Sequence, residues 1–190
     1  PALKRALDSL PESLQKPIAV GHRVVHGGER FAAPVRLDTA TLSYIESLSP
    51  LAPLHNPLCL QGIQTCLSRF GPDVPQVAVF DTAFYRNMPD RAKYYGIDRA
   101  LAEQHQIQRY GFHGISHDFM QRLYHRSALR AHPAARLITL HLGNGCSATA
   151  IRAGVAIDTS MGFTPLEGLL MATRCGDLDR CRCRRQEAQA

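Results

Sequence analysis

The feature that most constrains the fold is a succession of short apolar stretches and tight turns between residues 137 and 157. Gly143-Asn144-Gly145 predicts the first turn, because Asn-Gly favours positive φ at both central positions. Ala153-Gly154 predicts the second. The apolar stretches predict strands over 137–142, 147–152 and 155–157. Connections this short allow only antiparallel neighbours, so the late part of the chain is predicted to be a β-meander.

Upstream of the meander the patterns alternate between helix and strand. A strand over 18–25 ends at Gly27-Gly28, and a strand over 77–80 delivers Asp81 at its end. Asp38 or Thr39 caps a predicted helix that runs to about Leu48. Two short helices are predicted over 2–10 and 98–105. A third begins after Pro57, with an apolar stripe of Leu58, Ile63 and Leu67. A fourth begins at Ser116 or Asp118, with an apolar stripe of Ile115, Phe119, Leu123 and Leu129. The order of these elements indicates a mixed α/β protein.

Composition narrows the class of protein. A chain of 190 residues with 45% hydrophobic and 20% charged residues is typical of a globular protein of one ordinary domain or two small ones. No apolar run approaches the roughly 18 residues of a membrane span, and the first residues lack a signal-peptide pattern. We therefore expect a cytoplasmic protein that does not associate with membranes.

The net charge of +6 is concentrated at one end. Four arginines against Glu187 give residues 180–190 a net charge of +3, so the rest of the chain is only mildly basic. Such a body argues against nucleic acid as a partner. The alternative, nucleic-acid binding by the Arg-rich tail, would give an affinity that falls steeply with salt, but the tail has no aromatic stacking partners.

The cysteines are expected to be reduced thiols, because nothing marks the chain for export. They are Cys59, Cys66, Cys146, Cys175, Cys181 and Cys183. The last three raise the alternative of a zinc site, but their C-x5-C-x-C spacing matches no usual ligand pattern. We therefore expect no metal site there.

The turn at 143–145 is the candidate for phosphate binding. The sequence contains no G-x-x-x-x-G-K-[ST] loop and no strand–G-x-G-x-x-G–helix unit. Glycines let backbone N–H groups approach an anion closely, and Asn144 adds an amide donor. The alternative is an ordinary hairpin turn.

Four polar segments complete the candidate chemistry. Arg23 among valines is either an edge residue or an anion clamp, and Asp81 is either a site residue or a helix cap. His113 and His117 lie in a Gly-flanked loop, where either histidine donates to developing charge or caps local structure. Arg174 in a Gly-containing loop is by default a solvated charge. Two arginines, a carboxylate and a histidine suit phosphoryl transfer, which needs positive groups around spreading charge.

Six segments, in the family's order, closely resemble the acetokinase family. The match as a whole spans about residues 18–179. The segments are GHRVVHGGERF (21–31), LAPLHNP (51–57), VFDTAF (79–84), RYGFHGISH (109–117), HLGNGCS (141–147) and DTSMGFTPLEGLLMATRCGDLD (158–179). The resemblance implies an α/β chain that is part of the duplicated ribonuclease H-like fold of the acetate and sugar kinase/Hsc70/actin superfamily. It implies direct in-line transfer of the γ-phosphoryl of ATP, with Mg²⁺, to acetate, giving acetyl phosphate and ADP. Propionate kinase is the close alternative.

The resemblance also implies roles for individual residues. Arg23 and Arg174 hold acetate and the transferring phosphoryl group, Asp81 positions the substrate carboxyl, and His113 donates to a transition-state oxygen. The nucleotide phosphates are bound by His141, Gly143, Asn144 and Gly145. The acyl group is bound by a set of residues that also includes Arg23, namely Val25, Leu54, His55, Phe112 and Pro165.

The resemblance carries an expectation about completeness. Residues 1–82 match part of the family's N-terminal domain without its first strands, 83–179 match the start of the C-terminal nucleotide-binding domain, and 180–190 depart as an aberrant tail. The family's metal ligands lie outside the matched segments, and full-length members form homodimers. We therefore expect an incomplete kinase of weak or no activity, or a non-catalytic remnant that still binds phosphate.

Overall fold

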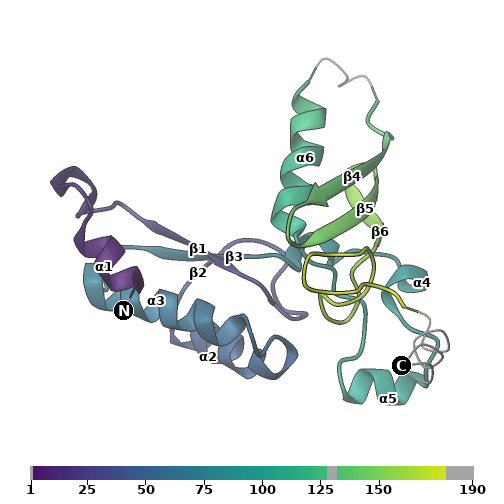
Figure 1. Cartoon of the computed structure of the whole chain (residues 1–190), viewed down its shortest axis with the longest axis horizontal. Helices are drawn as coiled ribbons and strands as arrows, with labels where there is room; N and C mark the ends of the chain where they lie inside the picture. Colours follow the sequence, from purple (N-terminus) through teal and green to yellow (C-terminus); the bar gives the residue numbers. More distant parts are fainter. Residues whose placement is uncertain (1, 128–131, 179–190) are drawn as a thin grey trace, which may run out of the picture. The chain divides into compact units, whose positions relative to one another are not determined.

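The computed structural model describes residues 2–127 and 132–178, which lie in two compact units, Pro1–Arg86 and Asn87–Ala190. Figure 1 shows the course of the chain through its elements. The boundary between the two units falls between residues 86 and 87 of the sequence. The division predicted after residue 82 concerns the family's domains and remains a prediction. The predicted aberrant tail, 180–190, lies outside the described residues. Within the described ranges, no helix is long and apolar enough to cross a bilayer.

The first unit is built on a three-stranded sheet in the order β1-β3-β2. Strands β1 (Val20–Val24) and β3 (Gln76–Phe80) are parallel, and the short β2 (Val35–Arg36) pairs antiparallel with β3. The register places Arg23 opposite Val79 and Val24 opposite Phe80. The carboxyl ends of β1 and β3 therefore meet at one edge, which is where α/β proteins place their sites.

Helices flank this sheet, and their boundaries follow local signals. They are α1 (Ala2–Asp8), α2 (Thr39–Ser47) and α3 (Asn56–Phe70), with short 3₁₀ turns at Glu12–Leu14, Ser49–Leu51 and Ala83–Tyr85. The carboxylate of Asp38 accepts a hydrogen bond of 2.7 Å from the Thr41 amide, which confirms Asp38 as the cap of α2. Pro57 lies in the first turn of α3, where its missing N–H costs nothing.

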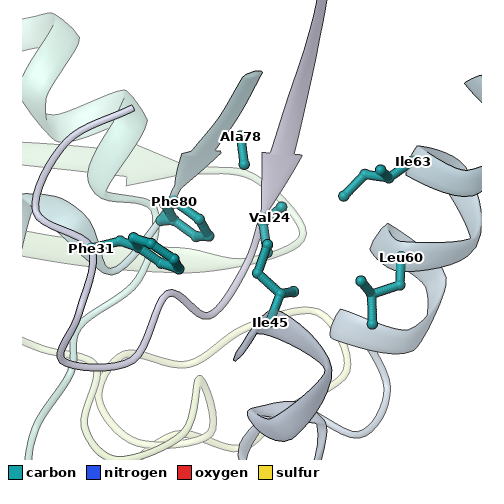
Figure 2. Packing of buried hydrophobic residues seen from close by; sticks show 7 residues of the cluster. All are labelled: Val24, Phe31, Ile45, Leu60, Ile63, Ala78 and Phe80. Carbon is teal, nitrogen blue, oxygen red and sulfur yellow. The ribbon is translucent and has the colours of Figure 1, made fainter. Parts of the chain in front are cut away.

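The core of the first unit joins the sheet to α2 and α3 (Figure 2). The buried cluster consists of Val24, Phe31, Ile45, Leu60, Ile63, Ala78 and Phe80. The rings of Phe31 and Phe80 stack with centroids 4.5 Å apart. Leu58, predicted on the apolar face of its helix, is 66% exposed. That prediction was wrong, because Leu60 and Ile63 turn toward the sheet and Leu58 lies on the opposite face of α3.

The second unit contains the predicted meander. Strands β4 (Arg136–Leu142), β5 (Cys146–Arg152) and β6 (Val155–Thr159) pair antiparallel in sequence order. Arg152 pairs with Val155 across a two-residue turn in which Ala153 and Gly154 both have positive φ, 51° and 80°. This turn has the conformation that was expected at Asn144-Gly145 instead.

The turn at 143–145 is present but differs from the prediction. Leu142 pairs with Cys146, so three residues connect the strands, and the Gly143 amide donates to the Gly145 carbonyl at 3.0 Å. None of the three residues has positive φ. The expected conformation was therefore wrong, because a three-residue connection does not require the backbone twist that favours Asn-Gly in two-residue hairpins.

The helices in the described residues of the second unit are α4 (Asp90–Lys93), α5 (Arg99–Gln104) and α6 (Gly114–Arg126). Helix α6 begins earlier than predicted and runs beside β4 (Figure 1). Its buried residues are Gly114, His117 and Gln121, whereas Phe119 and Leu123 of the predicted stripe are 61% and 50% exposed. The polar side of α6 therefore faces inward, contrary to the prediction; Leu129 lies outside the described residues.

Candidate functional site

Arg23 and Asp81 form an ion pair at the carboxyl edge of the first unit's sheet. Arg23 Nη2 lies 2.5 Å from Asp81 Oδ2, and Arg23 Nε lies 3.1 Å from the same oxygen and 3.2 Å from Oδ1. The Asp81 side chain is 2% exposed and that of Arg23 is 61% exposed. The hydrogen bond to Asp81 raises the pKa of Arg23 above its already high value. The buried carboxylate of Asp81 thus holds the Arg23 guanidinium by hydrogen bonds, while much of the Arg23 side chain remains accessible.

A hydrogen-bonded loop supports the end of β1. The His26 amide donates to Asn56 Oδ1, and Asn56 Nδ2 donates back to the His26 carbonyl, both at 3.1 Å. The Gly27 amide donates to Thr82 Oγ1 at 3.0 Å. Burial lowers the pKa of the His26 imidazole to about 4, so the ring is neutral near pH 7. These contacts tie the loop after Arg23 to the segment after Asp81.

The remaining predicted site residues of this unit differ in exposure. Val25, which directly follows β1, is 7% exposed. Leu54 is 77% exposed and His55 is also exposed, in the segment that leads into α3. Asp81 does not cap the turn that follows it, since Thr82 occupies that position. The place of Asp81 in the site remains a prediction.

His113 opens α6 in an unusual backbone conformation. Its φ is 58°, a left-handed value that few residues other than glycine adopt and that often marks a functional position. Its Nδ1 lies 2.8 Å from Ser147 Oγ, in the middle of the meander. Phe112, the preceding residue, is 1% exposed and anchors the loop.

His113 and Arg174 flank the same point of the 143–145 turn. A Cβ placed on Gly145 would lie 2.9 Å from His113 Cε1, 3.0 Å from His113 Nε2 and 3.0 Å from Arg174 Nη2. Glycine is thus the residue that lets an imidazole and a guanidinium approach this backbone together. The structure brings together a loop, a helix start and a hairpin that are far apart in the sequence.

Backbone contacts hold Arg174 in this position. Its Nη1 donates to the Pro165 carbonyl at 2.6 Å, and the Ala172 amide donates to the Asn144 carbonyl at 3.1 Å. Arg174 is half-buried. The default interpretation of a freely solvated loop arginine is therefore wrong.

His141 adds a second imidazole to this set. Its ring stacks on that of His113, with centroids 4.1 Å apart and an interplanar angle of 22°. Its Nδ1 lies 3.0 Å from Ser116 Oγ. Gly143 and Asn144 are exposed at the tip of the turn. The second unit therefore presents guanidinium, imidazole and amide groups around one short hairpin connection.

Hydrogen bonds among Tyr95, Glu167 and the Phe163 amide, called the Tyr95–Glu167 brace below, hold the loop after β6. The sequence did not predict them. The hydroxyl of Tyr95 hydrogen-bonds Glu167, and the Phe163 amide donates to the Tyr95 hydroxyl at 2.7 Å and to Glu167 Oε2 at 3.0 Å. Burial and the contact with Glu167 raise the pKa of Tyr95. Arg109 donates to the Thr159 and Met161 carbonyls at 3.3 Å. No local pattern links Tyr95 to Glu167, so only the folded chain identifies this brace.

The described residues place hydrogen-bond donors where they can bind anions. Over residues 2–127 and 132–178, no group of three or more His, Cys, Asp or Glu side chains is arranged to hold a metal ion. A cleft of about 460 Å³ lies beside Arg174. Guanidinium forks, imidazole donors and a glycine turn suit phosphate and carboxylate oxygens. The chemistry that fits both units is the handling of small oxyanions.

Comparison with known proteins agrees with this chemistry. The profile described as "Acetokinase family" matches residues 2–183. An acetate kinase of Streptomyces avermitilis is 55% identical over 161 residues, covering 85% of this chain and 40% of that protein. An acetate kinase of Chloroherpeton thalassium is 51% identical over 168 residues, covering 88% of this chain and 40% of that protein. The chain spans about 40% of the length of these curated relatives.

Solved structures show the same relationship. A propionate kinase of Francisella tularensis has a TM-score of 0.86 at 43% identity, covering 98% of this chain and 48% of that one. The Porphyromonas gingivalis acetate kinase has a TM-score of 0.82 at 40% identity, covering 94% and 45% respectively. These matches confirm the predicted fold class, a partial acetate and sugar kinase/Hsc70/actin fold.

Proposed function

Because the chain belongs to the acetokinase family, we propose that it is part of an acetate kinase. The reaction is reversible transfer of the γ-phosphoryl group of ATP to acetate, which gives acetyl phosphate and ADP. The observation that carries the proposal is the approach of His113 and Arg174 to Gly145, since phosphoryl transfer depends on donors positioned around the equatorial oxygens.

The proposed step is a direct in-line displacement. A carboxylate oxygen of acetate forms a bond to the γ-phosphorus, and the bond from that phosphorus to the β,γ-bridging oxygen breaks, leaving ADP. No phosphorylated side chain forms. Arg174 and the Nε2 side of His113 are assigned to the transferring oxygens, where charge spreads in the transition state.

The nucleotide phosphates are assigned to the turn and its neighbours, namely Gly143, Asn144, Gly145 and His141. The exposed residues Gly143 and Asn144 at the tip of the turn, beside the half-buried Gly145 and His141, support this assignment. Mg²⁺ enters the proposal as part of the MgATP substrate. The described residues contain no group of three or more His, Cys, Asp or Glu side chains that could hold it as a separate ion.

The carboxylate of the acyl substrate is assigned to Arg23, whose guanidinium is held in place by buried Asp81. The resemblance to the family assigns the acyl chain to Val25 and Leu54 in the first unit and to Phe112 and Pro165 in the second, with His55 as a further site residue. One methylene changes specificity by only about 1–3 kcal/mol. Propionate is therefore the alternative substrate, in line with the propionate kinase among the related structures.

A hydroxylamine trap for acyl phosphate tests the proposal. The purified chain is incubated with MgATP and either acetate or propionate, beside an Arg174→Ala variant. Acyl hydroxamate that disappears in the variant supports a kinase, and the better acid identifies the substrate. Equal hydroxamate from chain and variant refutes the role of Arg174, and no hydroxamate from the chain refutes catalysis by this polypeptide alone.

A second candidate function is phosphate binding without turnover. It is favoured by the fact that His113, Gly145 and Arg174 all lie within the second unit, whereas the chain spans about 40% of its relatives. Thermal stabilisation by inorganic phosphate that is lost in Arg174→Ala, without hydroxamate, identifies this function. A homodimeric assembly and a cytoplasmic location also remain proposals.

A further inference from the structure

A chain of hydrogen bonds leads from the interior of the second unit to His113. Thr139 Oγ1 lies 2.7 Å from His117 Nδ1. His117 Nε2 lies 2.9 Å from Ser147 Oγ, and the same oxygen lies 2.8 Å from His113 Nδ1. Ser147 is 0% exposed and His117 is 1% exposed. Two imidazoles therefore share one buried hydroxyl.

Proton counting leaves two arrangements for this chain. A hydroxyl carries one hydrogen, and a neutral imidazole donates from one nitrogen and accepts at the other. His117 is neutral near pH 7, because burial, assisted by nearby His141, lowers its pKa to about 4. His117 therefore either donates to Ser147 and accepts from Thr139, or donates to Thr139 and accepts from Ser147. A hydroxyl oxygen can accept from two imidazoles at once, but the hydrogen of the fully buried Ser147 hydroxyl would then have no acceptor among these contacts, which is costly. The remaining arrangements have the donors all pointing from Thr139 toward His113, or all in the opposite direction.

The first direction gives every hydrogen in this series of hydrogen bonds an acceptor within the series. Thr139 donates to His117 Nδ1, His117 Nε2–H donates to Ser147, and the Ser147 hydroxyl donates to His113 Nδ1. In the reverse direction the hydrogen of the Thr139 hydroxyl needs an acceptor other than these four residues. Because Thr139 is only half-buried, water can accept that hydrogen at little cost. The first direction is the one that leaves Nε2 of His113 as a donor, as the proposed function requires.

We infer that Ser147 and His117 are positioning residues that hold His113 as the tautomer protonated on Nε2. That nitrogen lies on the side of Gly145 and Arg174. The inference rests on the proposed function, in which His113 donates from Nε2 to a phosphoryl oxygen. Ser147 thereby decides which nitrogen of His113 acts as donor and which as acceptor.

Nitrogen-15 NMR of the histidine-labelled chain tests the inference without turnover. Two-bond ¹H–¹⁵N couplings distinguish the two neutral tautomers, and the signals lost in His113→Gln identify His113. We expect the Nε2–H form in the wild-type chain and a mixture of tautomers in Ser147→Ala. Ser147→Thr, which restores a hydroxyl, should restore the Nε2–H form. Inorganic phosphate should bind about fivefold to tenfold more weakly to Ser147→Ala.

Matched variants separate this role from a general loss of structure. Ser116→Ala removes a hydroxyl from neighbouring His141 and should leave the His113 tautomer unchanged. Thr139→Val preserves shape but removes the first donor, and should change the tautomer of His117 even if Ser147→Ala does not fold. An Nδ1–H form in the wild-type chain, or an unchanged His113 tautomer in Ser147→Ala, would overturn the inference. The expected tautomers without acyl hydroxamate would refute only the proposed reaction.

Discussion

Arg23 contacts Asp81 through both Nε and Nη2 across 58 positions of sequence, with the carboxylate almost completely buried and the guanidinium largely exposed. The exposures make the pair asymmetric. Removing the arginine leaves a buried charge without its cation, whereas removing the aspartate releases an arginine that water can solvate.

This asymmetry predicts unequal costs for the two variants. We expect Arg23→Met to lower the free energy of unfolding by about 2–4 kcal/mol and Asp81→Asn by about 1 kcal/mol. Urea denaturation of each variant measures the difference. Equal costs would show that the carboxylate is solvated in the native chain.

The steric limit at Gly145 predicts a loss of function with little loss of stability. A methyl group there would contact His113 and Arg174 at 2.9–3.0 Å, so Gly145→Ala should weaken inorganic phosphate binding at least about tenfold. Gly96→Ala, outside the assigned phosphate-binding residues, is the matched control, because a Cβ there would meet nothing within 4 Å. Isothermal titration of both variants checks this, and similar affinities would refute the assigned geometry.

Buried neutral histidines predict that the chain loses stability in mild acid. The pKa values of His26 and His117 fall to about 4 in the folded chain, below the ordinary value of 6.5. Between these values the unfolded chain binds more protons, so stability is fully present above about pH 6.5 and falls toward pH 4. The loss is up to about 3 kcal/mol for each ring.

Denaturation midpoints between pH 7.5 and 4.5 measure this loss. His26→Asn retains an acceptor for the Gly28 amide, which donates to His26 Nδ1 at 3.0 Å, but it cannot titrate in this range. We expect a shallower pH dependence in this variant. A slope identical to that of the wild-type chain would place the acid sensitivity elsewhere.

The Tyr95–Glu167 brace predicts an effect on Arg174 at a distance. Glu167→Ala removes the acceptor of the Phe163 amide and loosens the loop that carries the Pro165 carbonyl, the acceptor of Arg174 Nη1. We expect faster hydrogen exchange at the Phe163 amide and a cost of about 1–3 kcal/mol. Leu166→Ala, at an exposed neighbour, should leave this exchange rate unchanged.

The outer face of β4 predicts that the purified chain associates with itself. Ile138, Leu140 and Leu142 alternate along this strand and are 77%, 55% and 71% exposed. A stripe of this kind favours association. The triple change to threonine should reduce binding of a hydrophobic dye and raise the soluble yield, and an unchanged yield would mean that this face is not responsible.

Local signals predicted much of the framework. The meander, the Asp38 cap and the strand that precedes Asp81 follow from periodicity and turn residues, which act over a few positions. Predictions failed where neighbours in space decided the outcome. Phe119 and Leu123 are exposed because α6 packs on β4 through the face that carries His117, which hydrogen-bonds Thr139.

The candidate site also has features that the sequence predicts and features that only the fold decides. The residue types and their motifs were evident from the sequence, including Arg23, Asp81, His113 and Arg174. Two polar positions on the buried face of β5, Ser147 and Thr149, were an available but ambiguous signal. A buried hydroxyl in a strand identifies a partner only when that partner is known.

By itself the sequence determined the order of the longer helices and strands (though not the short β2 and α4), the positions of the turns and the chemical groups available to bind oxyanions. The tertiary structure alone decided that Asp81 pairs with Arg23, that Ser147 lies between two imidazoles, and that Gly145 admits both His113 and Arg174. The physical reason is range. Backbone preferences act between near neighbours in the chain, whereas hydrogen bonds and ion pairs depend on distances of about 3 Å that only the packed chain defines.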